Sequence, residues 1–147
     1  MTNRKIVLPA GTGFLGQSAA GYFKNKGYDI VILTRGPAGI KDGIEYVDWD
    51  AKTAGDWTGH IGNSYAVINF TGRSVNCIYN EKNKKDIIES RLHSVRALKE
   101  AIAKSPAPPR VFIQAASLAI YGDTTDLRDE SSPLGQGFSV DVCKQWE

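Results

Sequence analysis

The sequence has 147 residues, of which 41% are hydrophobic and 23% are charged, and its formal net charge is +2. This composition is typical of one globular domain with a single core, and it argues against disorder. A nearly neutral chain without a long run of Lys and Arg does not favour nucleic acid or an anionic membrane as a partner. Cys77 and Cys143 lack the spacing of a metal site or of a redox pair, so we expect no metal and a reducing, cytoplasmic environment. The sequence shows neither a signal peptide nor an apolar run long enough to span a membrane.

The first apolar run, residues 5–8, is predicted to be a buried parallel strand, and a glycine-rich turn follows it. The turn is spelled GTGFLG and places Gly11, Gly13 and Gly16 in a GxGxxG pattern. In a strand–turn–helix unit these glycines permit a tight turn, a close approach of the backbone to a pyrophosphate, and close packing of the next helix. The helix predicted over residues 14–26 would direct free N–H groups at the anion. We therefore predict a dinucleotide site, with a purely structural turn as the alternative.

The same stretch nearly spells the phosphate loop of nucleoside triphosphatases. Gln17 stands where that loop needs its lysine. Without this cation the charge of the β- and γ-phosphates has no partner, so a triphosphatase is disfavoured.

A second strand is predicted over residues 29–34, and Thr34 and Arg35 lie at its end. Folds of this kind that bind NAD usually carry an acidic residue here, which binds the ribose 2′-hydroxyl. An arginine can instead bind a 2′-phosphate with two hydrogen bonds, and Thr34 can add a hydroxyl contact. The Thr34–Arg35 pair therefore favours NADP over NAD, unless Arg35 is only a solvated side chain.

Residues 36–43 are too few and too rich in glycine for an ordinary crossover helix. The third strand, over residues 44–49, therefore has an abbreviated connection or lies at the periphery of the sheet. Asp48 or Asp50, near its end, can meet the adenine, or can serve as a turn or cap residue. Residues 51–64 are predicted to be a loop with one helical turn.

A fourth strand over residues 66–70 places Asn69, Thr71 and Gly72 at a carboxyl strand end, where open α/β sheets bind ligands. A long helix is predicted over residues 81–104, with an apolar stripe of Ile88, Leu92, Val95, Leu98 and Ile102.

His93 lies beside that stripe with no His or Cys at ligand spacing, and it is interpreted as a surface or hydrogen-bonded histidine rather than a catalytic one. A fifth buried strand, residues 111–116, brings Ser117 and Tyr121 to the same edge of the sheet. The closing residues begin a helical pattern.

Together these motifs resemble the extended short-chain dehydrogenase/reductase superfamily, in its nucleotide-sugar epimerase-like branch. The matching pieces are GTGFLG, LTR after the second strand, NFTG after the fourth, ESR in the long helix, SLAIYG after the fifth, and the closing WE. The resemblance covers nearly the whole chain. Within the superfamily the sequence is most similar to an atypical NADP-binding subgroup, the nucleoside-diphosphate-sugar epimerases, whose members carry a further C-terminal part.

Two departures from the family pattern stand out. Relatives use a Tyr-x-x-x-Lys pair for proton transfer, in which the lysine lowers the pKa of the tyrosine. By spacing, the pair would fall on Val142 and Trp146 or on Cys143 and Glu147, and neither combination is Tyr and Lys. The pair Tyr22 and Lys26 has the right letters but lies on the first helix, so it is interpreted as packing and surface. The chain is also short, so it is either a fragment of a longer protein or a natural half that borrows its lid, and we expect a fragment.

The sequence thus predicts an α/β, Rossmann-like, doubly wound parallel sheet of strand order 3-2-1-4-5, which forms one NAD(P)-binding domain over residues 1–147. The predicted function is that of an NADP-dependent epimerase/dehydratase-like oxidoreductase, with NAD as the alternative cofactor and a sugar nucleotide or other small carbonyl or hydroxyl compound as substrate. A non-catalytic NADP-binding or redox-sensing module is the rival, and a homodimer is left open. The candidate catalytic residues are Ser117 and Tyr121. The candidate cofactor-binding residues are Gly11, Thr12, Gly13, Phe14, Leu15, Gly16, Thr34, Arg35, Asp50, Asn69, Thr71 and Gly72.

Overall fold

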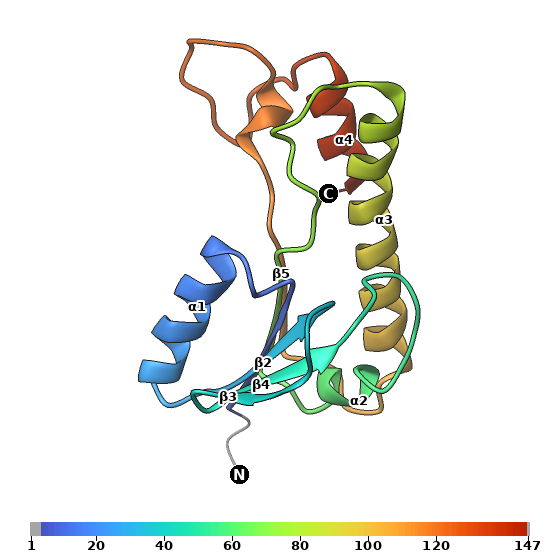
Figure 1. Ribbon diagram of the computed structural model, residues 1–147. Helices are drawn as coiled ribbons and strands as arrows, with labels where there is room; N and C mark the ends of the chain where they lie inside the picture. Colours follow the sequence, from blue (N-terminus) through green and yellow to red (C-terminus); the bar gives the residue numbers. More distant parts are fainter. Residues whose placement is uncertain (1–3, 147) are drawn as a thin grey trace.

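The computed structural model describes residues 4–146, which fold around one six-stranded sheet of order β3-β4-β2-β1-β5-β6 (Figure 1). The parallel strands are β1 (Lys5–Pro9), β2 (Asp29–Thr34), β4 (Ile44–Asp48), β5 (Ala66–Asn69) and β6 (Val111–Gln114). In chain order these are the five predicted strands, so the predicted order 3-2-1-4-5 is confirmed. A sixth strand, β3 (Gly39–Lys41), pairs antiparallel with β4.

Helices cover the two faces of the sheet. Figure 1 shows α1 (Phe14–Asn25) on one side and α3 (Glu81–Lys104) on the other, with the 3₁₀ helix η1 (Leu118–Tyr121) and α4 (Phe138–Trp146) beyond one end of the sheet. A short helix, α2 (Thr58–Ile61), lies near the opposite end of α3. Side chains of β1 alternate between the two faces, because Val7 joins the core cluster under α3 while Ile6 and Leu8 join the cluster under α1.

The strand β3 was missed by the sequence analysis, although the connection is abbreviated as expected. Asp42 and Gly43 form a two-residue turn between β3 and β4, with φ values of 51° and 65°. Positive φ at both positions is the geometry of a type I′ hairpin, for which Asp-Gly is a favoured sequence. The Asp42–Gly43 dipeptide therefore indicated a hairpin, but the three residues of β3 before it are too few to be recognised as a strand.

The helix over residues 81–104 is confirmed, but the predicted apolar stripe is only partly correct. Of its five members only Leu98 is buried, whereas the buried face consists of Ile87, Ser94, Ala97, Leu98 and Ala101. The helix is thus rotated so that small residues face the sheet, which lets the backbone approach closely. The larger aliphatic residues flank this face and are half-buried.

The prediction that the fifth strand is buried is wrong for the residues described. Val111, Phe112 and Ile113 of β6 remain 40%, 40% and 46% exposed. The physical reason is position, because β6 lies at the edge of the sheet and pairs with β5 alone. An apolar strand at an open edge leaves backbone N–H and C=O groups and apolar surface uncovered.

Candidate dinucleotide site

The carboxyl ends of the strands open into a cavity of about 1180 Å³. It is bounded by the turn after β1, the ends of β2 and β4, the loop after β5, and one face of α3. Among the predicted cofactor residues, those that line it are Thr12, Thr34, Arg35, Asp50, Thr71 and Gly72. The structure therefore brings together residues from four separate segments at the edge where open α/β sheets bind ligands.

The glycine turn is built by steric necessity at two of its three glycines. A Cβ added at Gly16 would lie 2.4 Å from the Cα of Gly11, and one at Gly11 would lie 2.9 Å from the carbonyl oxygen of Leu8. At Gly13 an added Cβ would meet no described atom within 4 Å, so this position borders open space. The helix α1 begins after Gly13 without a side-chain cap, which leaves its first N–H groups directed at that space.

Two predicted cofactor residues of this turn lie outside the cavity wall. Phe14 and Leu15, the first residues of α1, are 85% and 62% exposed and do not line the cavity. The left-handed backbone of the turn falls on Ala10, at φ 56°, rather than on a glycine. A non-glycine residue in this region is strained and is typical of functional sites.

Thr34 and Arg35 lie side by side on the cavity wall at the end of β2. The hydroxyl of Thr34 accepts a hydrogen bond from the N–H of Gly36 at 3.0 Å, and its side chain is buried. Arg35 is exposed and lines the cavity. The arginine is therefore available to an anion at this edge.

Asp50 lines the cavity, but its carboxylate is already engaged in a turn. It accepts hydrogen bonds from the N–H of Lys52 and from both the N–H and the hydroxyl of Thr53. The Thr53 hydroxyl and N–H are the main causes that lower the pKa of Asp50 below its ordinary value. The hydrogen bonds of Asp50 are therefore those of a turn residue, which was one of the two alternatives. Its side chain nevertheless forms part of the cavity wall.

The end of β5 is organised by Asn69, which is fully buried. Its amide donates to Gln114 Oε1 at 2.8 Å and its side-chain oxygen accepts from the N–H of Thr71 at 3.0 Å. Asn69 therefore fixes the exit of β5 against β6 and does not itself line the cavity. Gly72 has a steric role, because an added Cβ would lie 2.9 Å from Cζ of Arg91.

Several cavity residues were missed by the sequence analysis. Trp49 follows β4, and its backbone N–H donates to the carbonyl oxygen of Thr34 at 2.8 Å. This hydrogen bond holds the residue beside the Thr34–Arg35 pair. The other missed polar residues are Lys52, Arg73, Ser74, Asp86, Glu89, Ser90 and His93. Most come from α3 and the loop before it, and only the packing of α3 along the sheet brings them to the strand ends.

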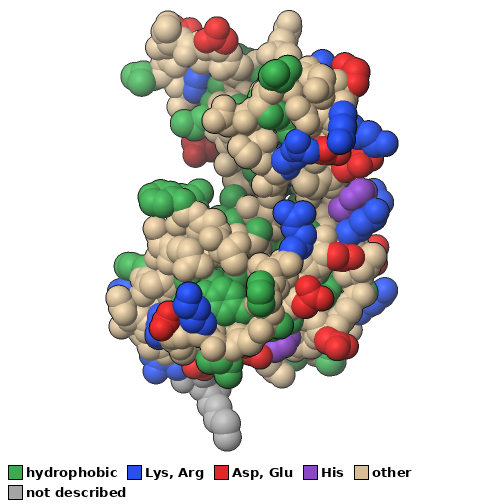
Figure 2. Space-filling view, viewed as in Figure 1, with side chains coloured by type: hydrophobic (Ala, Val, Ile, Leu, Met, Phe, Trp, Pro, Cys, Tyr) green, Lys and Arg blue, Asp and Glu red, His purple; other side chains and the backbone are tan. Residues whose placement is uncertain are grey.

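Two buried polar atoms on the cavity wall have no hydrogen-bond partner among the described residues. They are Nε1 of Trp49, which is 2% exposed, and Oγ1 of Thr71, which is 6% exposed. Buried polar atoms are nearly always paired, so each orphan marks a place where a ligand or an ordered water completes the site. Figure 2 shows that the surface narrows between the body formed by the sheet and the part that carries α4, with Lys and Arg side chains along this waist.

A second, smaller cavity of about 70 Å³ lies between α3 and α4. Ser117 lines it together with Arg91 of α3 and Ser139, Cys143 and Trp146 of α4. The hydroxyl of Ser117 accepts from the N–H of Ala119 at 3.2 Å. Tyr121 lines neither cavity, because its hydroxyl donates to the carbonyl of Asp129 at 2.9 Å and holds the loop that follows η1.

Three of the four positions expected for a Tyr/Lys pair fall on α4. Val142, Cys143 and Trp146 face the small cavity, whereas Glu147 lies outside the described residues. The misleading pair on α1 is at the surface, where Tyr22 is 57% exposed and Nζ of Lys26 lies 5.0 Å from the centre of its ring. Residues 4–146 contain no group of three or more potential metal ligands and no helix long and apolar enough to cross a membrane.

Comparison with known proteins places these features in a family. The epimerase family protein YfhF of Bacillus subtilis is 28% identical over 145 residues, which cover 97% of this chain and 48% of that protein. The human epimerase family protein SDR39U1 is 28% identical over 148 residues, covering 97% of this chain and 47% of its own length. The chain therefore spans about half the length of the curated relatives it matches.

Solved structures of epimerases have a similar fold. The human epimerase family protein SDR39U1 (isoform 2), solved with NADPH, superposes with a TM-score of 0.80 at 26% identity and covers 97% of this chain and 47% of that one. A nucleoside-diphosphate sugar epimerase from Corynebacterium glutamicum has a TM-score of 0.78 at 22% identity over 97% of this chain and 29% of its own, and so shares the fold. The model of the NAD dependent epimerase/dehydratase family matches residues 10–144, and the protein belongs to that family.

Proposed function

We propose that this chain is the dinucleotide-binding part of an NADP-dependent epimerase/dehydratase-like oxidoreductase. The observation that carries the proposal is the cavity at the strand ends, where Thr34 and Arg35 line the wall and the orphaned Trp49 Nε1 and Thr71 Oγ1 await a partner. The phosphate, ribose and adenine of NADP carry hydrogen-bond acceptors for the indole N–H of Trp49, and they carry both donors and acceptors for the hydroxyl of Thr71. The bound nicotinamide would supply hydride transfer.

In this proposal each wall of the cavity meets a different part of the cofactor. The open space at Gly13 and the uncapped start of α1 receive the pyrophosphate, with Gly11, Thr12 and Gly16 shaping the turn. Phe14 and Leu15 contribute backbone N–H groups rather than side chains. Arg35 and Thr34 bind the 2′-phosphate, and Trp49 and the Asp50 turn border the adenine.

Thr71 and Gly72 border the ribose in the same arrangement, and Asn69 positions them through its hydrogen bond to Thr71. The human relative solved with NADPH supports NADP as the cofactor, since it is 26% identical and matches 97% of this chain. We propose a small carbonyl or hydroxyl compound, such as a sugar nucleotide, as the substrate of the whole protein.

The test is a comparison of NADPH and NADH binding by the wild-type chain and by Arg35→Ala, followed by cofactor fluorescence. Loss of the guanidinium removes a charge-assisted contact with the 2′-phosphate, so NADPH binding should weaken by about tenfold or more. NADH lacks that phosphate, and its affinity should hardly change. Equal losses for both cofactors would reject the role of Arg35.

A second candidate function is an NADP-binding or redox-sensing module without catalysis. It is favoured by α4, whose face toward the small cavity carries Ser139, Val142, Cys143 and Trp146 in place of a Tyr/Lys pair. Such a module would bind NADPH and leave it unoxidised. Oxidation of NADPH in the presence of a sugar nucleotide or another carbonyl compound would defeat this alternative.

A further inference from the structure

The small cavity between α3 and α4 contains donors that no described residue uses. Trp146 is 9% exposed, and its indole Nε1 has no hydrogen-bond partner among the residues described. Nε of Arg91, on the facing helix, is also buried without a partner. Both side chains line the cavity of about 70 Å³. Two buried N–H donors beside one cavity indicate a missing acceptor.

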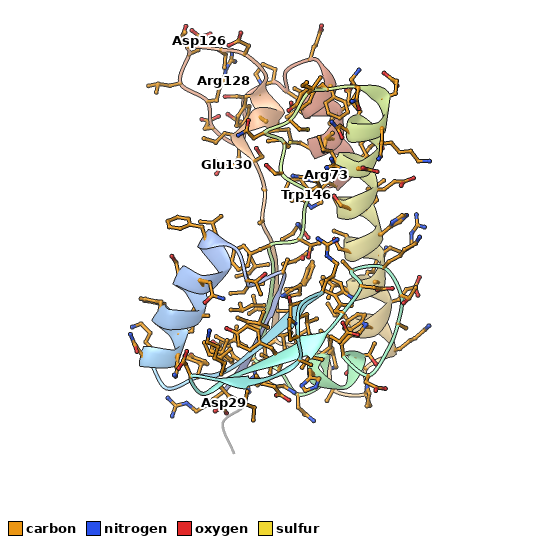
Figure 3. All side chains as sticks on the ribbon, in the orientation of Figure 1. Asp29, Arg73, Asp126, Arg128, Glu130 and Trp146 are labelled. Carbon is orange, nitrogen blue, oxygen red and sulfur yellow. The ribbon has the colours of Figure 1, made fainter. Side chains whose placement is uncertain are left out.

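The guanidinium of Arg91 is held in place by contacts on several sides. Its Cζ lies 4.9 Å from the centre of the Trp146 ring, and Gly72 leaves room for it on the loop before α3. Nη1 donates to the carbonyl oxygens of Arg73 and Ile87, at 3.1 and 3.0 Å. Figure 3 shows the side chain of Trp146 in the space between α4 and this loop, close to Arg73.

The charge of Arg91 lacks a carboxylate partner within residues 4–146, where its guanidinium donates to backbone carbonyl oxygens. Neither Asp nor Glu lines the cavity; the remaining polar lining consists of Ser117, Ser139 and Cys143. Burial lowers the pKa of Arg91, and the neighbouring Cys143 and Tyr79 act in the opposite direction. Arginine nevertheless stays protonated in proteins, so a partly desolvated positive charge faces this space.

We propose that the cavity between α3 and α4 binds a carboxylate group, with Nε of Arg91 and Nε1 of Trp146 as the donors. A carboxylate has two acceptor oxygens, and it supplies the negative charge that the guanidinium lacks. Since a cavity of about 10–15 Å³ holds one water, the 70 Å³ available here is large enough for this group. This inference rests on the proposed function, because it names an acidic group on the substrate that lies beside Ser117.

Three indole N–H signals allow the proposal to be tested in one spectrum, since the chain has three tryptophans. The protein labelled with ¹⁵N is titrated with acetate, a small carboxylate whose neutral isostere is acetamide, and in parallel with acetamide at matched ionic strength. Trp57 is an internal reference, because its Nε1 already donates to the carbonyl of Thr53 at 2.9 Å. Replacing each tryptophan by phenylalanine in turn assigns the signals.

Acetate should move the Trp146 signal along a saturable curve, acetamide should not, and the Trp57 signal should stay in place. In Arg91→Met the apparent affinity for acetate should fall by about tenfold or more, because the charged donor is lost. The matched control is Arg96→Met, which makes the same change at an exposed position of the same helix. A Trp146 signal that ignores acetate, or that follows acetamide equally, would overturn the proposal.

The wild-type titration does not use Arg91→Met and therefore decides the question even if that variant does not fold. The proposed function is tested separately by NADPH, which should move the signal of Trp49 whether or not acetate binds. A response of Trp49 to NADPH without a response of Trp146 to acetate would reject the carboxylate site and leave the cofactor site standing. A response of Trp146 to acetate without a response of Trp49 to NADPH would support the carboxylate site and reject the cofactor site.

Discussion

At the scale of single residues, two of the three glycines of the turn, Gly13 and Gly16, have separable roles. Gly16 is required by packing, since its Cβ would collide with the backbone of Gly11 at 2.4 Å. Gly13 borders open space, so an added methyl group there would meet no described atom of the protein, and under the proposed function it would meet the cofactor. The spacing of the motif predicted the close packing at Gly16, whereas the pyrophosphate contact at Gly13 stays a prediction and the strained backbone of Ala10 has no signal in the sequence.

We therefore expect Gly16→Ala and Gly13→Ala to differ in kind. Gly16→Ala should lower the free energy of unfolding by about 1–3 kcal/mol, as is usual for an overpacked site. Gly13→Ala should unfold in urea like the wild type and bind NADPH more weakly. Urea unfolding and an NADPH titration of both variants check this. A stable Gly16→Ala, or a Gly13→Ala with full affinity, would contradict these roles.

The carboxylate of Asp50 predicts a pH effect. Its pKa is lowered in the folded chain by the hydroxyl and N–H of Thr53, so its stabilising contribution is present above the unfolded pKa of about 3.9. The contribution is lost as the pH falls through the lower, folded value. Thr53→Ala should raise the pKa of Asp50 toward its ordinary value, which a carboxyl NMR titration measures.

Because Asp50 is largely exposed, the accompanying change in stability should stay well below about 1 kcal/mol. It should also shrink as the pH drops below the ordinary pKa. The control is Asp50→Asn, in which the Thr53→Ala change should have no pH-dependent effect in this range. An Asp50 titration that is identical with and without Thr53 would show that the hydroxyl does not hold the carboxylate.

At the scale of elements, hydrophobic runs and glycines predicted the strand order and both long helices. They did not predict which residues are buried where burial depends on the neighbouring elements. The buried face of α3 is set by small residues such as Ala97 that let it approach the sheet, and periodicity of large aliphatic residues could not reveal this. The exposure of β6 depends on what lies beside it, while its composition resembles that of a central strand.

The start of α3 offers a test of the loop that borders both cavities. Asn80 caps this helix, with its side-chain oxygen accepting from the N–H of Asn83 at 2.8 Å. Asn80→Ala should lower the free energy of unfolding by about 1 kcal/mol, the usual effect of losing such a cap. Asn80→Ser, which keeps an acceptor, should restore most of it in urea unfolding. A fully stable alanine variant would mean that the loop does not depend on the cap.

At the scale of the whole molecule, the sheet formed by the described residues ends at β6, an edge strand with exposed apolar side chains. Phe112 and Ile113 point to opposite faces of the strand, and both are at least 40% exposed. Exposed apolar edges pair with other chains. We expect the 147-residue chain to self-associate as its concentration rises.

Sedimentation velocity at increasing concentration measures this association. Ile113→Lys places a charge on the exposed edge and should keep the chain monomeric, whereas Ile40→Lys on the opposite edge strand is a matched control, since Ile40 is 81% exposed. Association that persists unchanged in Ile113→Lys would place the contact elsewhere.

Those cavity residues that lie in or next to the motifs could be predicted from the sequence, because the glycine turn and the strand ends each carry a local signal. Trp49 could not, since its orphaned indole Nε1 becomes visible only when β4 is placed beside β2. The same holds for Arg91 and Trp146, which lie 55 residues apart in the sequence and meet through the packing of α4 on α3.

The most direct test of the central claim is the indole N–H spectrum of the wild-type chain as NADPH is added. If the cavity at the strand ends binds the dinucleotide, the signal of Trp49 moves and saturates, and NADH produces the same movement only at higher concentration. If NADPH leaves the Trp49 signal unchanged at saturating concentration, the cofactor does not occupy this cavity and the assignment is wrong.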